Sequence, residues 1–192
     1  MIENSGDCIA MLDGRGRLKV VNSATWKLIE DVGLKPVEDL PWLEIWAGQA
    51  RESCEYAMGI AVKGRVGRYQ GINYMRNGEG RWFDVMLTPI PDDMGTTERI
   101  LVVARDITGT RSAEEKFRVL FEHSANAHII FDEDAILDCN HAAVEMMRCS
   151  TKLELLALTP DQLAPELQPD GAPSAEKRRE IWLLARGVGH FR

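Results

Sequence analysis

The sequence lacks the patterns of several common protein classes. Its four cysteines, Cys8, Cys54, Cys139 and Cys149, form no CxxC pair and have no histidine at ligand spacing, which argues against a metal site or a disulfide framework. No stretch reaches the run of about 18 apolar residues that a membrane span needs, and the N-terminus lacks a signal-peptide pattern. We therefore expect a cytoplasmic chain that makes no membrane contact itself.

Clustered positive charge is also absent. The 192 residues include 23 Lys and Arg against 30 Asp and Glu, for a net charge of −7. The longest basic cluster, Lys177-Arg178-Arg179, is flanked by Glu176 and Glu180, as is typical of a solvated helix face. Because phosphate contacts need clustered cations, this distribution argues against a nucleic-acid partner.

Catalytic spacings are missing as well. Asp84 and Asp106 are isolated carboxylates with no second acid or base at a motif spacing. The glycine-rich stretches 14–16 and 77–80 lack the Lys-Ser/Thr pair of a phosphate loop and predict hairpin turns instead. We therefore expect no enzymatic activity from this chain.

The region from residue 66 to residue 108 carries the clearest pattern that is present. Its three apolar runs are rich in β-branched and aromatic residues, and each ends in turn residues, so they predict three consecutive antiparallel strands. Upstream, a hairpin with an Asp-Gly turn is predicted over residues 8–21, and an amphipathic helix over residues 50–62. This order predicts an α+β fold, a five-stranded antiparallel sheet with helices on one face.

The second half of the chain repeats the first. Residues 121–124, 129–132 and 137–140 match residues 2–5, 10–13 and 19–22. A helix is predicted after Asn140 as after Asn22, and the amphipathic stretch 174–185 corresponds to 50–62. Residues 189–192 predict the start of a further strand. We therefore expect an incomplete second unit and a chain cut from a longer protein.

A linker helix is predicted between the two copies, over residues 110–121. Ser112 to Glu115 form a capping box that predicts the start of this helix. Ala113, Phe117 and Leu120 follow at 4-then-3 spacing and form a narrow apolar seam. Because a short isolated helix is marginal in water, we expect the seam to pack on the sheet or on a second copy of the chain.

Several of these features resemble the PAS domain family. They are Asn22 at the start of the first helix, Thr88-Pro89-Ile90 in the middle run, and Asp106-Ile107-Thr108 at the end of the last strand. The resemblance divides the chain into a PAS domain (1–109), the linker helix (110–121) and the N-terminal part of a second PAS domain (122–192). It implies a non-catalytic sensory module in a multidomain bacterial sensor of the histidine kinase type. We expect a homodimer that relays a signal to a downstream output domain.

A PAS unit encloses a small interior, which either a ligand or core side chains can fill. The positions that we expect to line it come from alternate strand residues and from the apolar face of the amphipathic helix. These candidates are Met11, Cys54, Ala57, Met58, Ala61, Ile72, Asn73, Phe83, Val85, Leu87 and Val103. The small residues among them leave volume for a small-molecule ligand.

The resemblance also raises the question of a cofactor. Light-sensing PAS domains carry an Asn-Cys-Arg segment, but the corresponding residues 42–46 contain no Cys, and of three flavin-contacting polar positions only Asn73 is retained. Haem sensors use a His on the long helix, and residues 50–63 contain none. We therefore expect no cofactor and retain a flavin- or haem-dependent sensor as the alternative.

Overall fold

The computed structural model describes residues 5–132 and 134–188, and its contacts divide the chain into Met1–Ala113 (unit 1) and Glu114–Arg192 (unit 2). Each unit has its own hydrophobic core. The strand predicted at residues 189–192 lies outside the described residues. The two units are therefore described separately.

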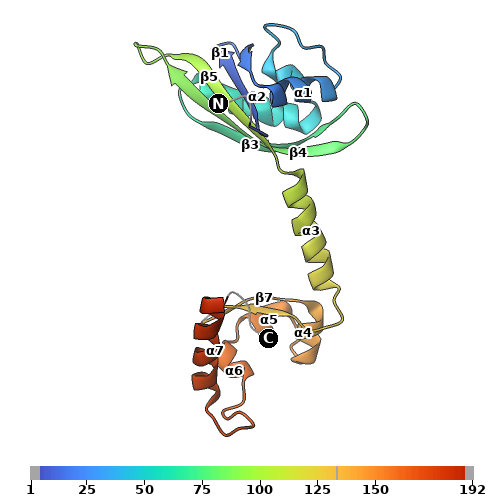
Figure 1. The fold of residues 1–192 in the computed structure, drawn as a ribbon, viewed down its shortest axis with the longest axis vertical. Coiled ribbons are helices and arrows are strands. Elements are labelled where there is room, and N and C mark those ends of the chain that lie inside the picture. Colours follow the sequence, from blue (N-terminus) through green and yellow to red (C-terminus); the bar gives the residue numbers. More distant parts are fainter. Residues whose placement is uncertain (1–4, 133, 189–192) are drawn as a thin grey trace. The chain divides into compact units, whose positions relative to one another are not determined.

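Unit 1 contains the predicted five-stranded sheet, which is antiparallel throughout. Its strands are β1 (Cys8–Asp13), β2 (Leu18–Val21), β3 (Gly67–Tyr74), β4 (Gly80–Pro91) and β5 (Thr97–Asp106). Their order across the sheet is β2-β1-β5-β4-β3 (Figure 1). The last strand therefore lies in the centre, between the first hairpin and the other two strands of the meander.

The helical segments of unit 1 cover one face of this sheet (Figure 1). They are α1 (Ser23–Asp31), the short 3-10 helix η1 (Trp42–Ile45) and α2 (Gly48–Val62). Helix α2 approaches β3 so closely that a Cβ atom at Gly67 would lie 2.2 Å from the backbone oxygen of Ala57. A side chain at Gly67 would therefore push the helix away from the sheet.

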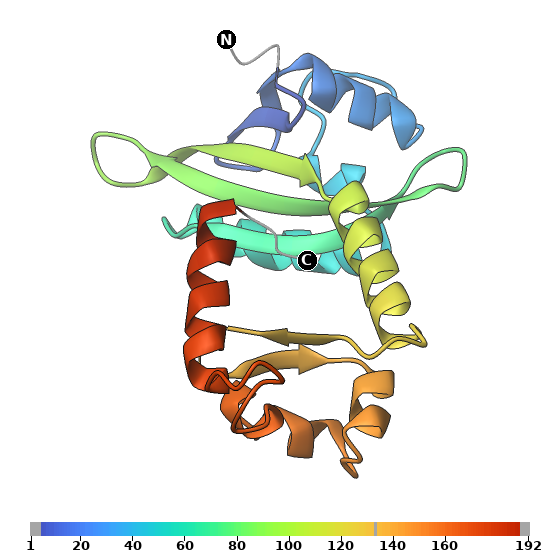
Figure 2. The same ribbon diagram turned by 60° about the horizontal axis from the view of Figure 1, so that its bottom comes forward.

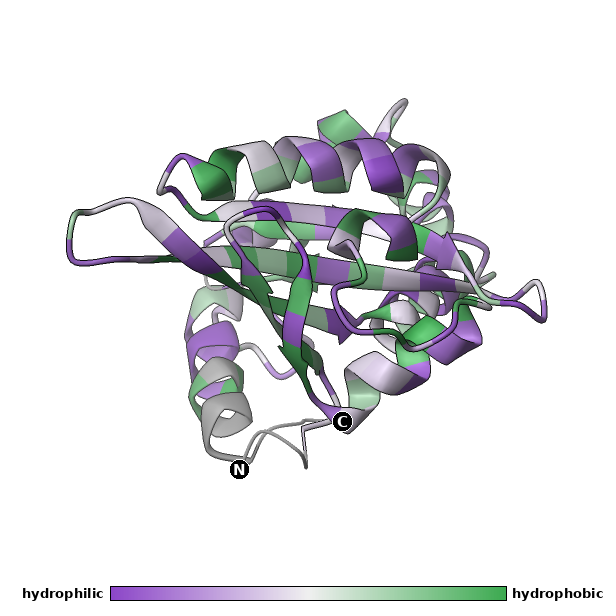
Figure 3. Ribbon diagram, turned by 90° about the horizontal axis from the view of Figure 1, so that it is seen from above, coloured by the Kyte–Doolittle hydropathy of each residue, from purple (hydrophilic) through white to green (hydrophobic). Residues whose placement is uncertain are grey.

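Polarity alternates along the strands of unit 1, as Figure 3 shows. On β4, the predicted inward residues Phe83, Val85 and Leu87 are buried, whereas Met86 on the other face is 42% exposed. This alternation follows from the two-residue period of a strand with only one face covered. The choice of inward residues on β4 is therefore confirmed.

Helix α3 (Thr108–Glu122) begins directly after β5, so the prediction that it starts at Ser112 is wrong. The Thr108 N–H donates to the Asp106 carboxylate at 2.8 Å, and the Arg111 N–H donates to the Ile107 carbonyl at 2.9 Å. These bonds satisfy N–H groups at the start of the helix. As a result, no loop separates the central strand from the helix.

The described part of unit 2 contains a two-stranded sheet followed by four helices. The strands are β6 (Ile129–Phe131) and β7 (Ile136–Cys139), and the helices are α4 (His141–Met146), α5 (Lys152–Leu156), α6 (Pro160–Leu163) and α7 (Ser174–Val188). Helices α4, α5 and α6 lie on one side of the hairpin (Figure 2). This part of the chain is thus an incomplete version of unit 1.

The predicted repeat extends to the register of the two hairpins. Ala10 pairs with Val21 in the first hairpin, and Ile129 pairs with Cys139 at the corresponding place in the second. Both ladders shift register two residues after these positions. The matching irregularity shows that the two hairpins have the same backbone construction.

The two equivalent asparagines also have the same backbone and bonding. Asn22 has φ −89° and ψ 173°, and Asn140 has φ −89° and ψ 171°. The side-chain oxygen of Asn22 accepts from the Thr25 N–H at 3.1 Å, and that of Asn140 accepts from the Ala143 N–H at 3.0 Å. In addition, the Asn140 amide donates to the Phe121 carbonyl at 2.9 Å, which ties the end of α3 to unit 2.

Candidate functional site

The inner face of the unit 1 sheet brings together most of the predicted cavity residues. Cys54, Ala57 and Ala61 on α2 are fully buried, and they belong to the same core cluster as Phe83, Val85 and Leu87 of β4. Asn73 is also buried, and its amide donates to the Ile45 carbonyl at 2.7 Å. Asn73 thus fixes the end of η1 to strand β3.

Three predicted cavity residues, Met11, Ile72 and Val103, lie on the opposite face of the sheet. Ala10 pairs with Val102, and both are buried, so their neighbours Met11 and Val103 must point outward. In the middle of β1 and β5, the residues that point to either face of the sheet are apolar. The sequence pattern therefore could not show which of them point inward. Ile72 is outward because its neighbours on β3 are the buried ones.

Met58 is only partly buried, at the edge of the core. A Cβ atom built at Gly16 would lie 3.4 Å from the Met58 methyl group. The side chain therefore covers the β1–β2 turn instead of reaching the middle of the interior.

Aromatic side chains occupy the region between the sheet and η1. The ring centroid of Trp46 lies 5.8 Å from that of Trp42 and 5.5 Å from those of Tyr69 and Phe83, all in edge-on geometry. Within the described part of the chain, the indole nitrogen of Trp46 has no hydrogen-bond partner. These rings occupy part of the interior that either a ligand or core side chains could fill.

The thiols in this core are not reactive groups. Burial raises the pKa of Cys54 to about 11 and that of Cys8 to about 12, and burial also raises the pKa of Tyr69. Because a thiol reacts as the thiolate, both cysteines are inert at neutral pH.

The strand-end motif Asp106-Ile107-Thr108 joins the sheet to α3. The Trp82 N–H donates to the Thr108 hydroxyl at 2.8 Å, and the Ile107 N–H donates to the Trp82 carbonyl at 2.8 Å. The guanidinium carbon of Arg111 lies 3.8 Å from the centroid of the Trp82 ring. The first turn of α3 is therefore bonded to β4 as well as continuous with β5.

The predicted apolar seam of α3 is exposed. Ala113 is exposed, and Phe117 and Leu120 are 61% and 73% exposed. Phe117 stacks on Phe121 at a centroid distance of 5.7 Å, and Phe121 is buried. The helix thus presents a strip of apolar surface that no other described residue covers.

The outer face of the unit 1 sheet is a second apolar surface. Its middle is formed by half-buried or exposed apolar side chains of β1, β4 and β5, namely Ile9, Met11, Met86, Leu101 and Val103. Two ion pairs border it: Arg68 donates to Asp84 at 3.0 Å, and Arg105 donates to Asp7 at 2.9 Å. The hydrogen bond from Arg68 lowers the pKa of Asp84, so this carboxylate stays charged at neutral pH.

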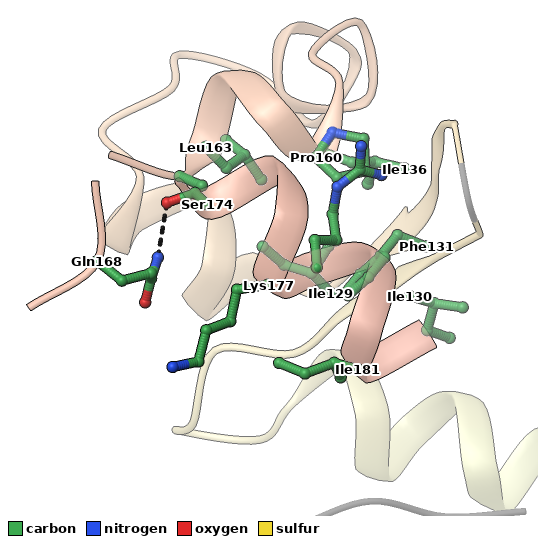
Figure 4. Close-up of a pocket in the computed structure, with 12 residues that line it drawn as sticks. Ile129, Ile130, Phe131, Ile136, Pro160, Leu163, Gln168, Ser174, Lys177 and Ile181 are labelled. Carbon is green, nitrogen blue, oxygen red and sulfur yellow. Dashed lines mark hydrogen bonds between the residues drawn. The ribbon is translucent and has the colours of Figure 1, made fainter. Parts of the chain in front are cut away.

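A pocket that sequence reasoning missed lies in unit 2, with a volume of about 690 Å³. Its apolar wall comes from β6, β7, α6 and α7 and includes Ile129, Phe131, Ile136, Leu163 and Ile181. Figure 4 shows Gln168, Ser174 and Lys177 at one end, away from Ile130, Phe131 and Ile136. The internal repeat could have indicated the wall of this pocket, because Ile129 and Phe131 match the inward residues Ala10 and Leu12.

The described residues lack two other kinds of site. They contain no group of three or more His, Cys, Asp or Glu side chains arranged to hold a metal ion. None of the helices in residues 5–132 and 134–188 is long and apolar enough to cross a membrane. The features that remain are the two apolar surfaces and the pocket.

Solved structures with a similar backbone have low sequence identity to this chain. An RNA-binding light-oxygen-voltage receptor is 17% identical with a TM-score of 0.49, over 62% of this chain and 35% of its own. The PAS domain of an HTR-like protein from Haloarcula marismortui is 23% identical with a TM-score of 0.39, over 55% of this chain and 85% of its own. A phage VqmA–DPO complex is 20% identical with a TM-score of 0.46, over 62% of this chain and 55% of its own.

Two protein families match this chain, one in each unit. No curated protein matches the chain. The family described as PAS fold matches residues 2–112, and the family described as PAS domain matches residues 115–182. The first match covers more than half of the sequence and coincides with the five-stranded unit. The chain therefore belongs to the PAS family, with one match over unit 1 and a second over most of unit 2.

Proposed function

We propose that this chain is the dimeric, non-catalytic sensory and relay module of a multidomain bacterial sensor of the histidine kinase type. In this proposal the module acts in the cytoplasm, responds to a small molecule, passes the response to an output domain of the same protein and has no nucleic-acid partner. The net charge of −7 supports the absence of a nucleic-acid partner, and the isolated thiols support a cytoplasmic location.

The direct connection from β5 to α3 is the observation that carries the proposal. Trp82 and Thr108 fix the first turn of α3 to β4, and no flexible loop absorbs a change in the sheet. A change in the twist or packing of the sheet would therefore alter the direction of the helix. A ligand could drive this change only through different affinities for the two packings.

Dimerisation supplies the surface on which such a movement would act. The exposed seam of α3 and the outer face of the unit 1 sheet are both apolar. A second copy of the chain would bury both kinds of surface with the same residues, as two-fold interfaces do. We therefore expect a homodimer in which the two α3 helices lie side by side.

The experiment is sedimentation of wild-type protein, Leu120→Asp and Val119→Asp. Leu120 belongs to the seam, whereas Val119 is also exposed, at 48%, but points away from it. We expect Leu120→Asp to weaken the dimer by about tenfold or more, because it places a charge in an apolar contact, and Val119→Asp to leave it nearly unchanged. A wild-type chain that stays monomeric at high concentration would overturn the proposal.

A further inference from the structure

Helix α2 has an exposed face on the side away from the sheet. The side toward the sheet carries the buried residues Cys54, Ala57 and Ala61. The opposite side is centred on Gly59, and the residues three and four positions before and after it share this face. All five members of this face are exposed, namely Glu55, Tyr56, Gly59, Val62 and Lys63.

The middle of this face is apolar and hollowed. Tyr56 is 75% exposed and Val62 is 46% exposed, one on each side of Gly59 along the helix. A groove of about 350 Å³ lies between Tyr56, Gly59 and Ile60, and charged side chains close it. Large apolar side chains beside a groove are typical of a surface that another protein covers.

Gly59 has no steric reason within the described part of the chain. Glycine inside a helix lowers its stability relative to alanine, because glycine loses more freedom on folding. At Gly67 and Gly71 of β3 a Cβ atom would lie 2.2 Å and 2.8 Å from atoms of α2, whereas a Cβ atom at Gly59 would have nothing within 4 Å. On the exposed face, glycine allows a second helix to approach the backbone closely.

The charges on this side of the helix are divided between its two halves. Glu52 and Glu55 lie before Gly59, and Lys63 and Arg65 follow it. Arg51 is directed elsewhere, because its guanidinium donates to a carbonyl oxygen of η1 at 3.2 Å. None of the two acids and two cations is in an ion pair within the part of the chain that the structure describes. The face is therefore acidic at one end and basic at the other.

Such a surface is complementary to itself. When two identical helices pack antiparallel about a two-fold axis at Gly59, each position before Gly59 faces the position equally far after it in the other copy. Glu55 of one copy then faces Lys63 of the other, and Tyr56 faces Val62. Both opposite charges and both apolar side chains are matched, twice in each contact.

From this arrangement we propose that the exposed face of α2 binds a second copy of the chain, with two antiparallel α2 helices that cross at Gly59. This contact is separate from the α3 seam and goes beyond the proposed sensory function. One helix face is a small interface, so the association is weak. Two different two-fold contacts on one chain join dimers into larger assemblies.

The test is sedimentation equilibrium of full chains that all carry Leu120→Asp, so that association through α3 does not mask the α2 contact. We expect Lys63→Glu and Glu55→Lys each to weaken the remaining association by about tenfold or more, because each places like charges opposite one another. The double variant should restore it. This rescue cannot arise within one chain, because the two residues lie eight positions, or about 12 Å, apart along the helix.

Lys27→Glu is the matched control, because Lys27 is an exposed cation of another helix, α1, and receives the same change of charge. A further variant, Gly59→Leu, tests the crossing point. We expect it to abolish association and to leave the thermal midpoint of unfolding equal or higher, because leucine favours a helix more than glycine does.

Four results would each overturn the inference. They are a Leu120→Asp chain that stays monomeric at high concentration, a double variant as weak as the single ones, association retained in Gly59→Leu, and Lys27→Glu acting like Lys63→Glu. None of the last three changes the comparison of Leu120→Asp with Val119→Asp, so the α2 contact and the proposed function fail separately.

Discussion

The two hairpins of the molecule have the same register but differ in burial and in the strands beside them. Leu12 of β1 is fully buried, whereas the matching Phe131 of β6 is 46% exposed. In unit 1 the first strand lies between β2 and β5, but in the described part of unit 2 the equivalent strand has only β7 beside it. Local sequence therefore determines the hairpin, and a distant strand determines how much of it is buried.

The same contrast separates a filled interior from an open one. In unit 1, Trp42 and Trp46 are buried and belong to the main core cluster. In unit 2, the inner side of β6 and β7 borders a pocket. Emptying the interior of unit 1 therefore tests how much of its stability comes from these two side chains.

The largest expected effect comes from Trp46→Ala, which would empty the middle of unit 1. Trp46 is 1% exposed and contacts three other rings, so its loss should lower the free energy of unfolding by about 3–5 kcal/mol. Urea unfolding followed by tryptophan fluorescence measures this loss, and indole added to the variant should restore part of it.

Trp26→Ala is the matched control, because it makes the same chemical change at a side chain that is 36% exposed. Its expected loss is about 1 kcal/mol or less. Equal losses for the two variants would show that the aromatic core of unit 1 is not its main source of stability.

A medium effect is expected from Asn22→Ala and Asn140→Ala, which remove the same interaction from each unit. Each replacement removes the side-chain acceptor of two backbone N–H groups, those of Ile9 and Thr25 in unit 1 and those of His128 and Ala143 in unit 2, and should cost about 2 kcal/mol in its own unit. Hydrogen exchange at Thr25 and Ala143 shows which unit has opened.

Asn77→Ala is the control for this pair, because Asn77 lies in an exposed hairpin turn and should matter little. Faster exchange at both sites in both variants would mean that the two units unfold together. Exchange confined to the mutated unit would support two independent folding units joined by α3.

The sequence predicted the elements that depend on neighbouring residues. The five strands, the capping asparagines and the internal repeat all follow from local patterns, and the structure confirms them. The inward set on β4 was also predictable, because only Phe83, Val85 and Leu87 were uniformly apolar.

The sequence could not determine features that depend on distant partners. Met11 and Val103 were assigned to the wrong face because β1 and β5 are apolar on both faces, and only their mutual register separates the two sets. The start of α3 at Thr108 depends on a bond to Trp82 of another strand. The unit 2 pocket brings residues of four elements together, and no short motif marks it.

The smallest expected change in stability concerns the interactions that attach α3 to each unit. Unit 1 uses the uncharged Thr108–Trp82 bond, whereas unit 2 uses Lys152, whose ammonium lies 2.8 Å from Glu122 on α3 and 2.6 Å from Asp138 on β7. The hydrogen bond from Lys152 lowers the pKa of Asp138 in the folded chain. A lowered folded pKa means that the stabilisation is present above the ordinary carboxyl pKa of about 4 and is lost as the pH falls through the folded value.

Lys152→Met should therefore destabilise unit 2 at neutral pH and have no effect in acid. All three groups are more than a third exposed, so the expected loss at neutral pH is only about 0.5 kcal/mol, and salt should reduce it. Urea unfolding over a series of pH values measures the difference from wild type, with Lys116→Met as the control, since Lys116 is exposed and has no ion pair among those of the described residues. A difference that persists below the folded pKa of Asp138 would mean that Lys152 stabilises unit 2 through the packing of its alkyl chain.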